Sequence, residues 1–597
     1  MMRKTSGGRH TMNPLKLRLD RRLSALVSAI VAALLLASVP QSTTALAQQN
    51  AKRRVIVLTD IGPEGPADLD DVQSMIRFVL YSNEVDIEAL IATRIGDATV
   101  HKDYIQNIVN AYGQIRSNLL LHKSGYPASS YLLSVIKGGH PQAEMGNMGP
   151  SGDSEGSNAI IAVVNKSDAR PVYIVIWGGS YDLAQALWRV RNDLGAAGAN
   201  QFASKIRVNC DADQYSATGP WIRQNFPKLF WIHDGPTARD NWTWQENLLR
   251  TPLRGFYLGG DTSLVSVNWI DTNLKGHGPL GDMYPTFAGG VNGVKDAHPF
   301  LSLLPLGHQD FEKPTWGGWG GRFGEAGPQY FSTAQDTVAG ETSGRATVSR
   351  WRPGFQNDFA ARMDWCVKPY NQANHHPVAV VNGSLTRTVS SGQTVTLDAS
   401  GSSDPDGNGL VYSWWLYREP SSYAGSLTIQ NSASKVAPFE APNVASSQTL
   451  HMILEVKDTG TPSLYAYQRV VVTVVPGGMP PPAAPTGVTA TATASSQINL
   501  LWTDASGNET GFKIERAAAS AGPWTQIATV GVNVTTYSNT GLPASTTYHY
   551  RVRATNTAGD SANSKVASAT THPVKSQKSA SIEPAVTIPK LEFASSH

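Results

Sequence analysis

Charged residues are scarce in this sequence, and their signs nearly cancel. Asp, Glu, Lys and Arg make up 16% of the 597 residues, and the formal net charge is +3. Binding to nucleic acid depends on dense positive charge that neutralises phosphates, and this chain has no such excess. We therefore expect no nucleic acid polymer as a partner.

Cysteine is almost absent, because the chain has only Cys210 and Cys366. Two cysteines exclude a disulfide framework, so stability has to come from packed cores. They are also too few for a structural zinc site of the cysteine-rich kind. Whether the two form one bridge stays open at the level of sequence.

Long hydrophobic runs are absent apart from residues 23–39. Basic residues precede this run, namely Lys16, Arg18, Arg21 and Arg22, and the small residues of Ala45-Leu46-Ala47 follow it. This order is typical of a secretory signal peptide, which we place at residues 1–47. An uncleaved membrane anchor is the alternative. We expect a secreted protein, periplasmic or extracellular, without stable membrane insertion.

Two common catalytic motifs are missing as well. No Gly-x-Ser-x-Gly elbow is present, which disfavours serine-hydrolase chemistry, and the glycine-rich residues 316–322 lack the Lys-Ser/Thr of a phosphate loop. That segment places Trp316 and Trp319 three residues apart among glycines. Both indoles are predicted to stack on a sugar or a base of the substrate. The alternative, in which both lie buried under a folded loop, stays open.

What the sequence does contain begins with strand-like runs that alternate with helix-like segments. Three such pairs follow one another, at residues 55–58 and 72–81, 172–177 and 183–190, and 206–208 and 221–226. This alternation predicts parallel βαβ units, and hence an α/β doubly wound domain with a mostly parallel sheet. We assign it residues 48–370 of a multi-domain chain that is too long for one core.

Beyond residue 376 the helical period ends, and short alternating runs between Gly, Asp, Ser and Pro predict two β-sandwiches. An Ig-like or cadherin-like sandwich is placed at 371–475, a Pro-rich linker at 476–485, a second sandwich at 486–572 and a disordered tail at 573–597. The second sandwich resembles fibronectin type III domains, with Trp502 in the place of the core tryptophan and Tyr548 at the tyrosine corner.

Acidic residues crowd the end of the first predicted strand. Residues 60–71 contain four Asp and one Glu in twelve positions. Asp60 ends the strand, and Asp70 and Asp71 are expected to open the next helix. In open α/β sheets ligands bind beyond the carboxyl ends of the strands, so these three carboxylates are expected to converge. Carboxylates so close together repel one another unless a cation lies between them, and oxygen donors of this kind favour Ca²⁺.

A structural role is the alternative for such acids, because Asp and Glu are favoured at helix N-caps and in first turns. We interpret Glu64 and Asp68 in this way, and favour function for the other three. Glu155 raises the same question. It belongs to a segment that is expected to cap the following helix, and it is also a candidate substrate-binding residue that lines the pocket.

The acidic turn resembles the amino-terminal signature of the inosine-uridine nucleoside hydrolases, which reads roughly D-x-D-P-G-x-D-D after the first strand. Thr59-Asp60 and Asp70-Asp71 match its two ends. The resemblance is closer to the nucleoside-hydrolase-like domain of a bacterial group described as cellulose-binding, in which a C-terminal sandwich also follows. Five blocks carry this narrower resemblance, at residues 153–157, 177–179, 183–187, 221–227 and 316–322.

The resemblance implies roles for individual residues. Asp60 would be a Ca²⁺ ligand and the base for the attacking water, and Asp71 would be a second ligand. Asp70 would be a catalytic residue that binds sugar hydroxyls. Tyr181 would lend a backbone carbonyl to Ca²⁺, and Asp296 would be a late carboxylate ligand.

His298 follows Asp296 and is implied as the proton donor to the leaving group. His233, His277 and His308 compete for this role, so the assignment stays open. The chain also departs from the hydrolases, because its acidic turn is longer and Thr93-Arg94 stands where they place an Asn. A ribose site is therefore not implied.

These features predict a secreted hydrolase of N-glycosidic or related glycosyl bonds that uses a carboxylate-bound Ca²⁺ to activate water. Its substrate would be a nucleoside or a glycoside. The alternative is a catalytically silent protein that binds a polysaccharide such as cellulose on the same scaffold, since fold resemblance alone does not establish activity. A purely adhesive protein is a third, less favoured interpretation.

Overall fold

The computed structural model describes residues 52–63, 65–93, 99–211, 217–234, 260–286, 297–477 and 481–574, without the side chains of 65–68. The predicted signal peptide and all but the start of the predicted tail lie outside these residues. Within them, no helix has both the length and the apolar character needed to cross a membrane. The chain divides into two compact units, one holding the α/β domain with most of the first sandwich and the other holding the rest of that sandwich with the second one.

An eight-stranded sheet forms the centre of the α/β domain, in the order β3-β2-β1-β4-β5-β6-β8-β7. Its strands are β1 (Arg53–Thr59), β2 (Val85–Ala92), β3 (Ile136–Gly138), β4 (Val172–Ile176), β5 (Ile206–Cys210), β6 (Phe230–His233), β7 (Phe323–Gly327) and β8 (Tyr330–Thr333). All neighbours pair in parallel except β7 and β8, which pair antiparallel. The predicted mostly parallel, doubly wound sheet is confirmed.

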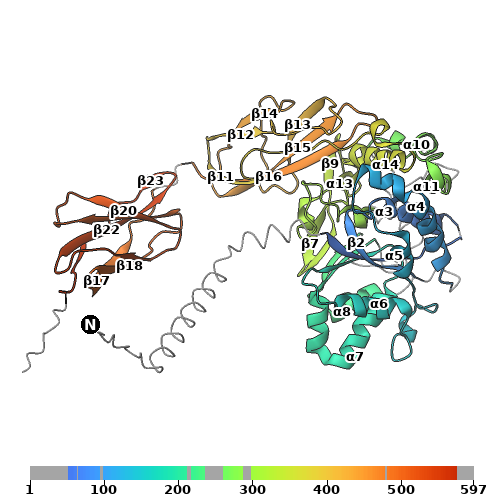
Figure 1. Cartoon of the computed structure of the whole chain (residues 1–597), viewed down its shortest axis with the longest axis horizontal. Helices are drawn as coiled ribbons and strands as arrows, with labels where there is room; N and C mark the ends of the chain where they lie inside the picture. Colours follow the sequence, from blue (N-terminus) through green and yellow to red (C-terminus); the bar gives the residue numbers. More distant parts are fainter. Residues whose placement is uncertain are drawn as a thin grey trace, which may run out of the picture. The chain divides into compact units, whose positions relative to one another are not determined.

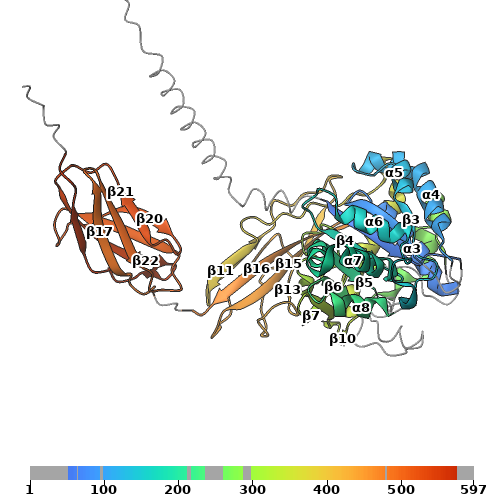
Figure 2. The same ribbon diagram turned by 90° about the horizontal axis from the view of Figure 1, so that it is seen from below.

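Helices cover both faces of this sheet, as Figures 1 and 2 show. One face packs against α3 (Gly65–Leu80), α4 (Lys102–His122), α12 (His298–Leu301) and α14 (Arg352–Val367), and the other against α6 (Glu155–Val164), α7 (Tyr181–Ser204) and α8 (Thr218–Asn225). Within β1, Val55 and Val57 belong to the first core, and Ile56 and Leu58 belong to the second. Both faces of a parallel sheet are covered, so its strands are apolar at consecutive positions rather than at alternate ones.

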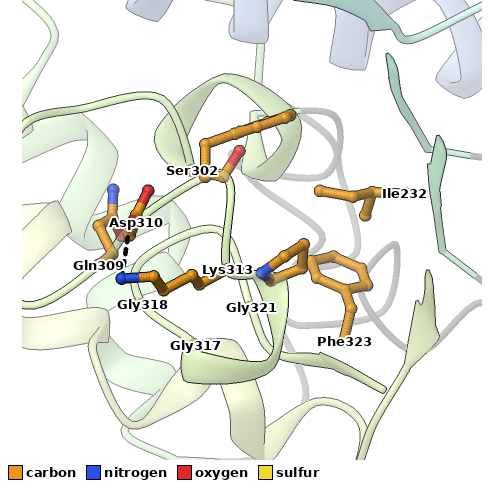
Figure 3. Close-up of a pocket in the computed structure, with 11 residues that line it drawn as sticks. Ile232, Ser302, Gln309, Asp310, Lys313, Gly317, Gly318, Gly321 and Phe323 are labelled. Atoms are coloured by element: carbon orange, nitrogen blue, oxygen red, sulfur yellow. Dashed lines mark ion pairs between the residues drawn. The ribbon is translucent and has the colours of Figure 1, made fainter. Parts of the chain in front are cut away.

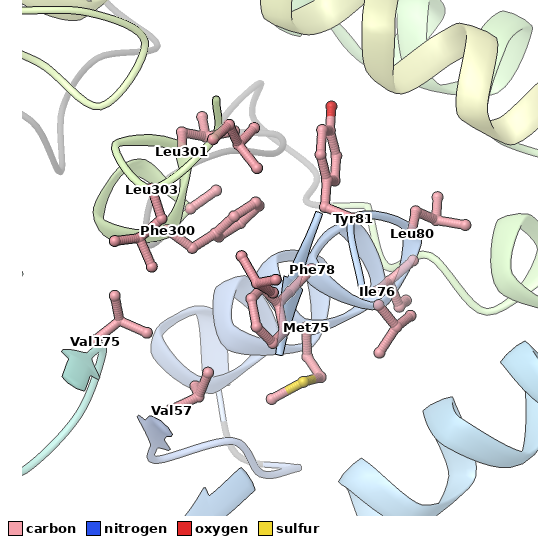
Figure 4. Packing of buried hydrophobic residues seen from close by; sticks show 14 of the residues in the cluster. Val57, Met75, Ile76, Phe78, Leu80, Tyr81, Val175, Phe300, Leu301 and Leu303 are labelled. Atoms are coloured by element: carbon pink, nitrogen blue, oxygen red, sulfur yellow. The ribbon is translucent and has the colours of Figure 1, made fainter. Parts of the chain in front are cut away.

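The core on the α3 face brings distant segments together (Figure 4). Phe300 of α12 packs edge-on against Phe78 of α3, with ring centroids 5.2 Å apart, and against Trp177 after β4, at 6.1 Å. These three aromatic side chains are almost fully buried. Their packing fixes α12 above the sheet, although α12 lies more than 200 residues after α3 in the chain.

Helix α3 begins earlier than the sequence predicts. It starts at Gly65, so Asp70 and Asp71 lie in its second turn and do not open it. Pro66 accounts for the earlier start, because the fixed φ of proline suits the first turn of a helix and its missing N–H is not needed there.

Short elements connect the main ones. They are α5 (Ser129–Ser134), η1 (Met145–Asn147), η2 (Thr262–Val265), α10 (Val267–Asn273), α11 (Gly278–Asp282), η3 (Pro314–Trp316), β9 (Asp336–Val338), β10 (Glu341–Ser343), α13 (Ala346–Ser349) and η4 (Tyr370–Gln372). Strands β9 and β10 form a separate antiparallel pair. Cys210 and Cys366 are both buried, and no disulfide joins them.

The first sandwich contains β11 (Thr386–Ser390), β12 (Thr394–Asp398), β13 (Leu410–Tyr417), β14 (Val436–Glu440), β15 (Gln448–Asp458) and β16 (Tyr465–Val475). One sheet has the order β11-β16-β15-β13, and β12 pairs with β14 in the other. Tyr417, Ile453 and Tyr467 belong to the same buried cluster as the α3 face of the α/β domain. This sandwich therefore shares a core with the α/β domain.

The second sandwich consists of two sheets, with the strand orders β17-β18-β21 and β20-β19-β22-β23. Its strands are β17 (Thr486–Ala494), β18 (Gln497–Thr503), β19 (Gly511–Ala517), β20 (Thr525–Gly531), β21 (Thr536–Asn539), β22 (Thr547–Asn556), β23 (Gly559–Asp560) and β24 (Ala567–Thr570), which pairs with β22. Trp502 is buried in its core, as predicted. Tyr548 is only half-buried, whereas Tyr550 is fully buried and donates to Asn539 Oδ1 at 2.9 Å.

Candidate functional site

The carboxyl ends of four neighbouring strands align at one edge of the sheet. The Trp177 N–H donates to Leu58 O at 2.8 Å, the Asp211 N–H to Ile176 O at 2.9 Å and the Asp234 N–H to Cys210 O at 3.0 Å. Asp60, Asp211 and Asp234 each follow one of these strands directly, namely β1, β5 and β6. Three carboxylates from distant parts of the chain therefore lie along the same edge.

The chain changes direction across the sheet between β1 and β4. From β1 it runs outward to β2 and β3, and from β4 it runs the other way to β5 and β6. A crevice at such a switch point, outside the carboxyl ends of the strands, is where doubly wound sheets bind ligands. Asp60 lies at this point.

The predicted acidic cluster is buried at the switch point. Asp60, Asp70 and Asp71 are each at most 2% exposed. The Thr59 hydroxyl donates to the Asp71 carboxylate, and the Asp71 N–H donates to Asp70 Oδ1 at 3.1 Å. Asp71 is thereby tied to the end of β1, so the second turn of α3 lies against the residue that precedes Asp60.

Gly178, in the segment after β4, lies directly against Asp60. A Cβ added at Gly178 would fall 2.7 Å from the Asp60 backbone nitrogen and 2.8 Å from its Cβ and Cγ. Any side chain at position 178 would therefore overlap Asp60. This contact explains the need for glycine within the Trp177-Gly178-Gly179 block.

Asp60 and Asp71 offer carboxylate oxygens at the switch point, which is the kind of donor that Ca²⁺ takes in flexible coordination. Tyr181 begins α7 after β4, in the position from which its backbone carbonyl is predicted to bind the ion. Its buried hydroxyl donates to Asn147 O at 2.9 Å, and burial together with Asp182 and Asp153 raises the pKa of Tyr181 to about 12. Asp296, the predicted late ligand, lies outside the described residues.

A second group of ligands is brought together by the fold. Among the described residues, the one set of three or more His, Cys, Asp or Glu side chains with gathered ligand atoms is Asp211, Asp234 and His298, all within 4.8 Å of one another. All three are 0% exposed. The predicted trio of Asp60, Asp70 and Asp71 does not form such a set in the described chain.

Sequence reasoning missed Asp211 and Asp234, although a signal was present. Both directly follow buried apolar runs, as Asp60 does, and the rule that ligands bind beyond strand ends applies equally to them. The run that precedes Asp234, residues 230–233, is only four residues long. His298 is the member of the set that the sequence did indicate, as a proton donor, and its Nδ1 lies 3.6 Å from Asp211 Oδ1.

Neighbouring side chains hold this second group in place. The Thr333 hydroxyl of β8 donates to Asp234 Oδ1 at 2.5 Å. Asn209, on β5, donates from Nδ2 to Pro299 O at 3.3 Å and to Ser302 Oγ at 3.1 Å. These bonds tie α12 to the sheet, so His298 faces Asp211.

The other predicted histidines have different surroundings. His233 packs against the Tyr330 ring at 6.4 Å, and His277 pairs with Asp364 Oδ1 at 3.1 Å. The hydrogen bond to Asp364 raises the pKa of His277. His308 is packed between Trp351 and Tyr467, with ring centroids 4.3 Å from each.

Glu155 lies in the first turn of α6, whose N-cap is Ser154. Its carboxylate accepts from the Gly138 N–H at 2.8 Å and from Lys102 Nζ at 2.9 Å. These two donors lower the pKa of Glu155, although 58% of its side chain is exposed. The predicted substrate-binding carboxylate is thus engaged with Lys102 at the end of β3.

The two tryptophans of the glycine-rich segment differ in exposure. Trp319 is 0% exposed and packs edge-on against Phe355 and Tyr467, so its indole offers no surface for a sugar. Trp316 is half-buried, with Lys313 Nζ 4.0 Å and Arg469 Cζ 5.2 Å from its ring centroid. Trp319 is therefore buried, as the alternative interpretation expected. The side chains close to Trp316 are the cationic groups of Lys313 and Arg469.

A small pocket lies beside this segment, lined in part by Ser302, Asp310, Lys313 and Phe323 (Figure 3). Lys313 Nζ is 3.5 Å from Asp310 Oδ2. The cavity volume of about 20 Å³ suits one or two water molecules. It does not accommodate a sugar ring.

Comparison with known proteins identifies the first domain. Residues 54–323 match the family described as "Cellulose-binding Sde182, nucleoside hydrolase-like domain". A solved structure of a nucleoside hydrolase-related hypothetical protein from Saccharophagus degradans, associated with carbohydrate metabolism, is 36% identical and covers 71% of this chain and 100% of its own, with a TM-score of 0.58. The chain belongs to the Sde182 family. The nucleoside-hydrolase-like resemblance is thereby confirmed.

Further matches follow along this Sde182-family chain. Residues 394–474 match "Cellulose-binding protein Sde0182, C-terminal domain", and residues 483–570 match the fibronectin type III domain. An Fn3-like protein from Clostridium thermocellum is 31% identical over 16% of this chain and 100% of its own, with a TM-score of 0.15. A search of curated proteins found no match. Both acidic groups of the candidate site fall within the Sde182-family match at 54–323.

Proposed function

We propose that this protein hydrolyses an N-glycosidic or related glycosyl bond at the switch point between β1 and β4. One observation supports this most strongly: Asp60 and Asp71 are both buried at the carboxyl edge of a nucleoside-hydrolase-like sheet, and Asp60 lies against Gly178, where any side chain would overlap it. Burying a carboxylate is costly unless hydrogen bonds or a cation compensate its charge, and a bound cation would contribute this compensation at the switch point.

In this proposal Asp60 and Asp71 hold Ca²⁺, together with the Tyr181 backbone carbonyl. When bound, the ion would lower the pKa of a coordinated water and favour its hydroxide form. Asp60 accepts the proton of the attacking water, and Asp70 accepts hydrogen bonds from sugar hydroxyls. Positive charge that develops on the sugar is stabilised by these fixed carboxylates, because they need no reorganisation during the reaction. The substrate is a nucleoside or a glycoside.

A second candidate is a polysaccharide-binding protein without turnover. Its support is the printed description of the family as cellulose-binding, together with the sandwiches that follow the first domain. Modules linked in this way raise the effective concentration of an attached domain near an insoluble polymer. This function does not require the acids at the switch point.

The decisive variant is Asp71→Asn, which removes a proposed ligand while keeping the size of the side chain. Calcium titration by calorimetry and a screen of nucleosides and plant-polymer glycosides are run on the full chain. We expect Asp71→Asn to lose Ca²⁺ binding and to lower turnover by roughly 100-fold or more. Asp193→Asn, at an exposed position of α7, is the matched control and keeps both properties.

The same samples separate the two candidates. One outcome would contradict the hydrolase and leave the binding function. The protein would bind insoluble cellulose, the screen would give no product, and Asp71→Asn would bind cellulose as the wild type does. Turnover that persists after complete removal of Ca²⁺ would contradict the role of the ion.

A further inference from the structure

Two carboxylates and one imidazole meet in the interior at the carboxyl ends of β5 and β6. The ligand atoms of Asp211, Asp234 and His298 lie within 4.8 Å of one another, and all three side chains are 0% exposed. They come from three separate elements, so their meeting is a product of the fold. A divalent cation bound by such a set favours the ionised form of the carboxylates in the interior.

The spacing suits two ligands of one small ion. His298 Nδ1 and Asp211 Oδ1 are 3.6 Å apart, which is too long for a hydrogen bond. Ligand atoms that are each about 2.1 Å from a metal and separated by this distance subtend roughly 118° at it, between tetrahedral and trigonal geometry. The third ligand atom, on Asp234, lies within 4.8 Å of the other two.

The donor types also differ from those of the switch point. Asp60 and Asp71 offer only oxygen, which suits Ca²⁺, whereas an imidazole nitrogen suits zinc, cobalt and other first-row transition metals. Adjacent strands lie about 4.8 Å apart, so Asp211, two strands from Asp60, is roughly 10 Å away along the sheet edge. The two groups therefore differ in their donor chemistry and in the strands that carry them.

The supporting contacts are those of a preorganised metal site. Thr333 donates to Asp234 Oδ1 at 2.5 Å and so orients that carboxylate, while Asn209 anchors α12, which carries His298. Second-layer hydrogen bonds of this kind orient ligands and are needed for full metal affinity.

We propose that Asp211, Asp234 and His298 bind one divalent transition metal ion of the zinc type, at a site separate from the Ca²⁺ site. The assignment replaces the proton-donor role predicted for His298, because an imidazole nitrogen bound to a metal has no proton to give. It does not depend on the proposed hydrolysis.

The test uses the full chain, stripped with a chelator and titrated with Co²⁺, whose visible absorption reports coordination. We expect one equivalent to bind with a visible d–d band that Zn²⁺ abolishes by displacement. His298→Gln and Asp234→Asn are expected to weaken this binding at least 10- to 100-fold. His277→Gln is the matched control, since His277 also pairs with a carboxylate, Asp364, and it leaves Co²⁺ binding unchanged.

Three outcomes would overturn the proposal. The wild-type protein gives no Co²⁺ band, or the variants bind Co²⁺ as the wild type does. In the third, the X-ray absorption-edge spectrum of the zinc-loaded protein shows no imidazole ligand. The edge spectrum uses wild-type protein only, so it decides the question even if a variant fails to fold. Asp71→Asn separates this site from the proposed function, because it is expected to lose Ca²⁺ and keep Co²⁺.

Discussion

Gly178 and Gly179 are neighbours in sequence, but their surroundings differ. A Cβ at Gly178 would meet the Asp60 backbone nitrogen at 2.7 Å, whereas nothing lies within 4 Å of a Cβ at Gly179. Non-bonded carbon atoms do not approach to such distances without displacement. The position of Asp60, and with it the candidate site, therefore depends on a glycine, which has no Cβ, at position 178.

We expect Gly178→Ala to displace Asp60, to weaken Ca²⁺ binding and to lower the free energy of unfolding by about 1–3 kcal/mol, as overpacking does. Gly179→Ala serves as the control and is expected to change neither property. Thermal unfolding and calcium titration of both variants measure the effect. Equal behaviour of the two variants would contradict the contact.

At the scale of elements, α14 is joined to the turn between α3 and β2 by one buried cation. The Arg362 guanidinium donates to Leu80 O and Asn83 Oδ1, both at 2.9 Å, and to Glu84 Oε1 at 3.0 Å. Burial acts to raise the pKa of Glu84, but the charges of Arg362 and Lys123 outweigh it and lower that pKa from 4.5 to about 2. The folded protein therefore keeps Glu84 ionised at pH values where the unfolded chain binds a proton.

This shift predicts how stability depends on pH. The contribution of Glu84 is fully present above pH 4.5 and is lost as the pH falls toward 2, because protons then bind the unfolded chain more readily. We expect a contribution on the order of 3 kcal/mol, measured as the difference between wild type and Glu84→Gln in urea unfolding, and we expect it to shrink from pH 5 to pH 2. Glu325→Gln, at an exposed position of β7, is the control and should match wild type. A difference that is independent of pH would rule out the ion pair as its cause.

At the scale of the whole molecule, the α/β domain and the first sandwich behave as one structural unit. Tyr467 of β16 packs edge-on against Trp351 at 5.5 Å and Trp319 at 6.3 Å, and Tyr417 packs against Trp351 at 5.8 Å. The Arg469 guanidinium also donates to His308 O at 2.6 Å. Large aromatic side chains of the first domain are thus covered by the sandwich that follows.

We expect a fragment that ends at residue 370 to be markedly less stable than one that ends at residue 477. The shorter fragment loses Tyr417, Ile453 and Tyr467 from its core, and each buried side chain of this size contributes roughly 1.5–3 kcal/mol. Urea unfolding of the two fragments, both without the second sandwich, measures the difference. Equal midpoints would show that the shared core contributes little.

The sequence alone determined the class of the fold and the position of Asp60. An apolar run such as residues 55–58 predicts a buried strand from the local pattern alone. Because Asp60 comes at the end of this strand, its place at the edge of the sheet followed from the sequence as well. The start of α3 was not predicted correctly from the sequence. We expected Asp70 and Asp71 to open the helix, whereas it begins at Gly65.

Only the tertiary structure decided which acids meet. Asp211, Asp234 and His298 are separated by 23 and 64 residues in the chain, and the register of β5 against β6, together with the packing of α12 by Phe300 and Asn209, brings them within 4.8 Å. The burial of Trp319 and the shared core likewise depend on contacts between distant segments. Local patterns specify strands and helices, whereas the meeting of side chains depends on the order of strands in the sheet, which no local pattern encodes.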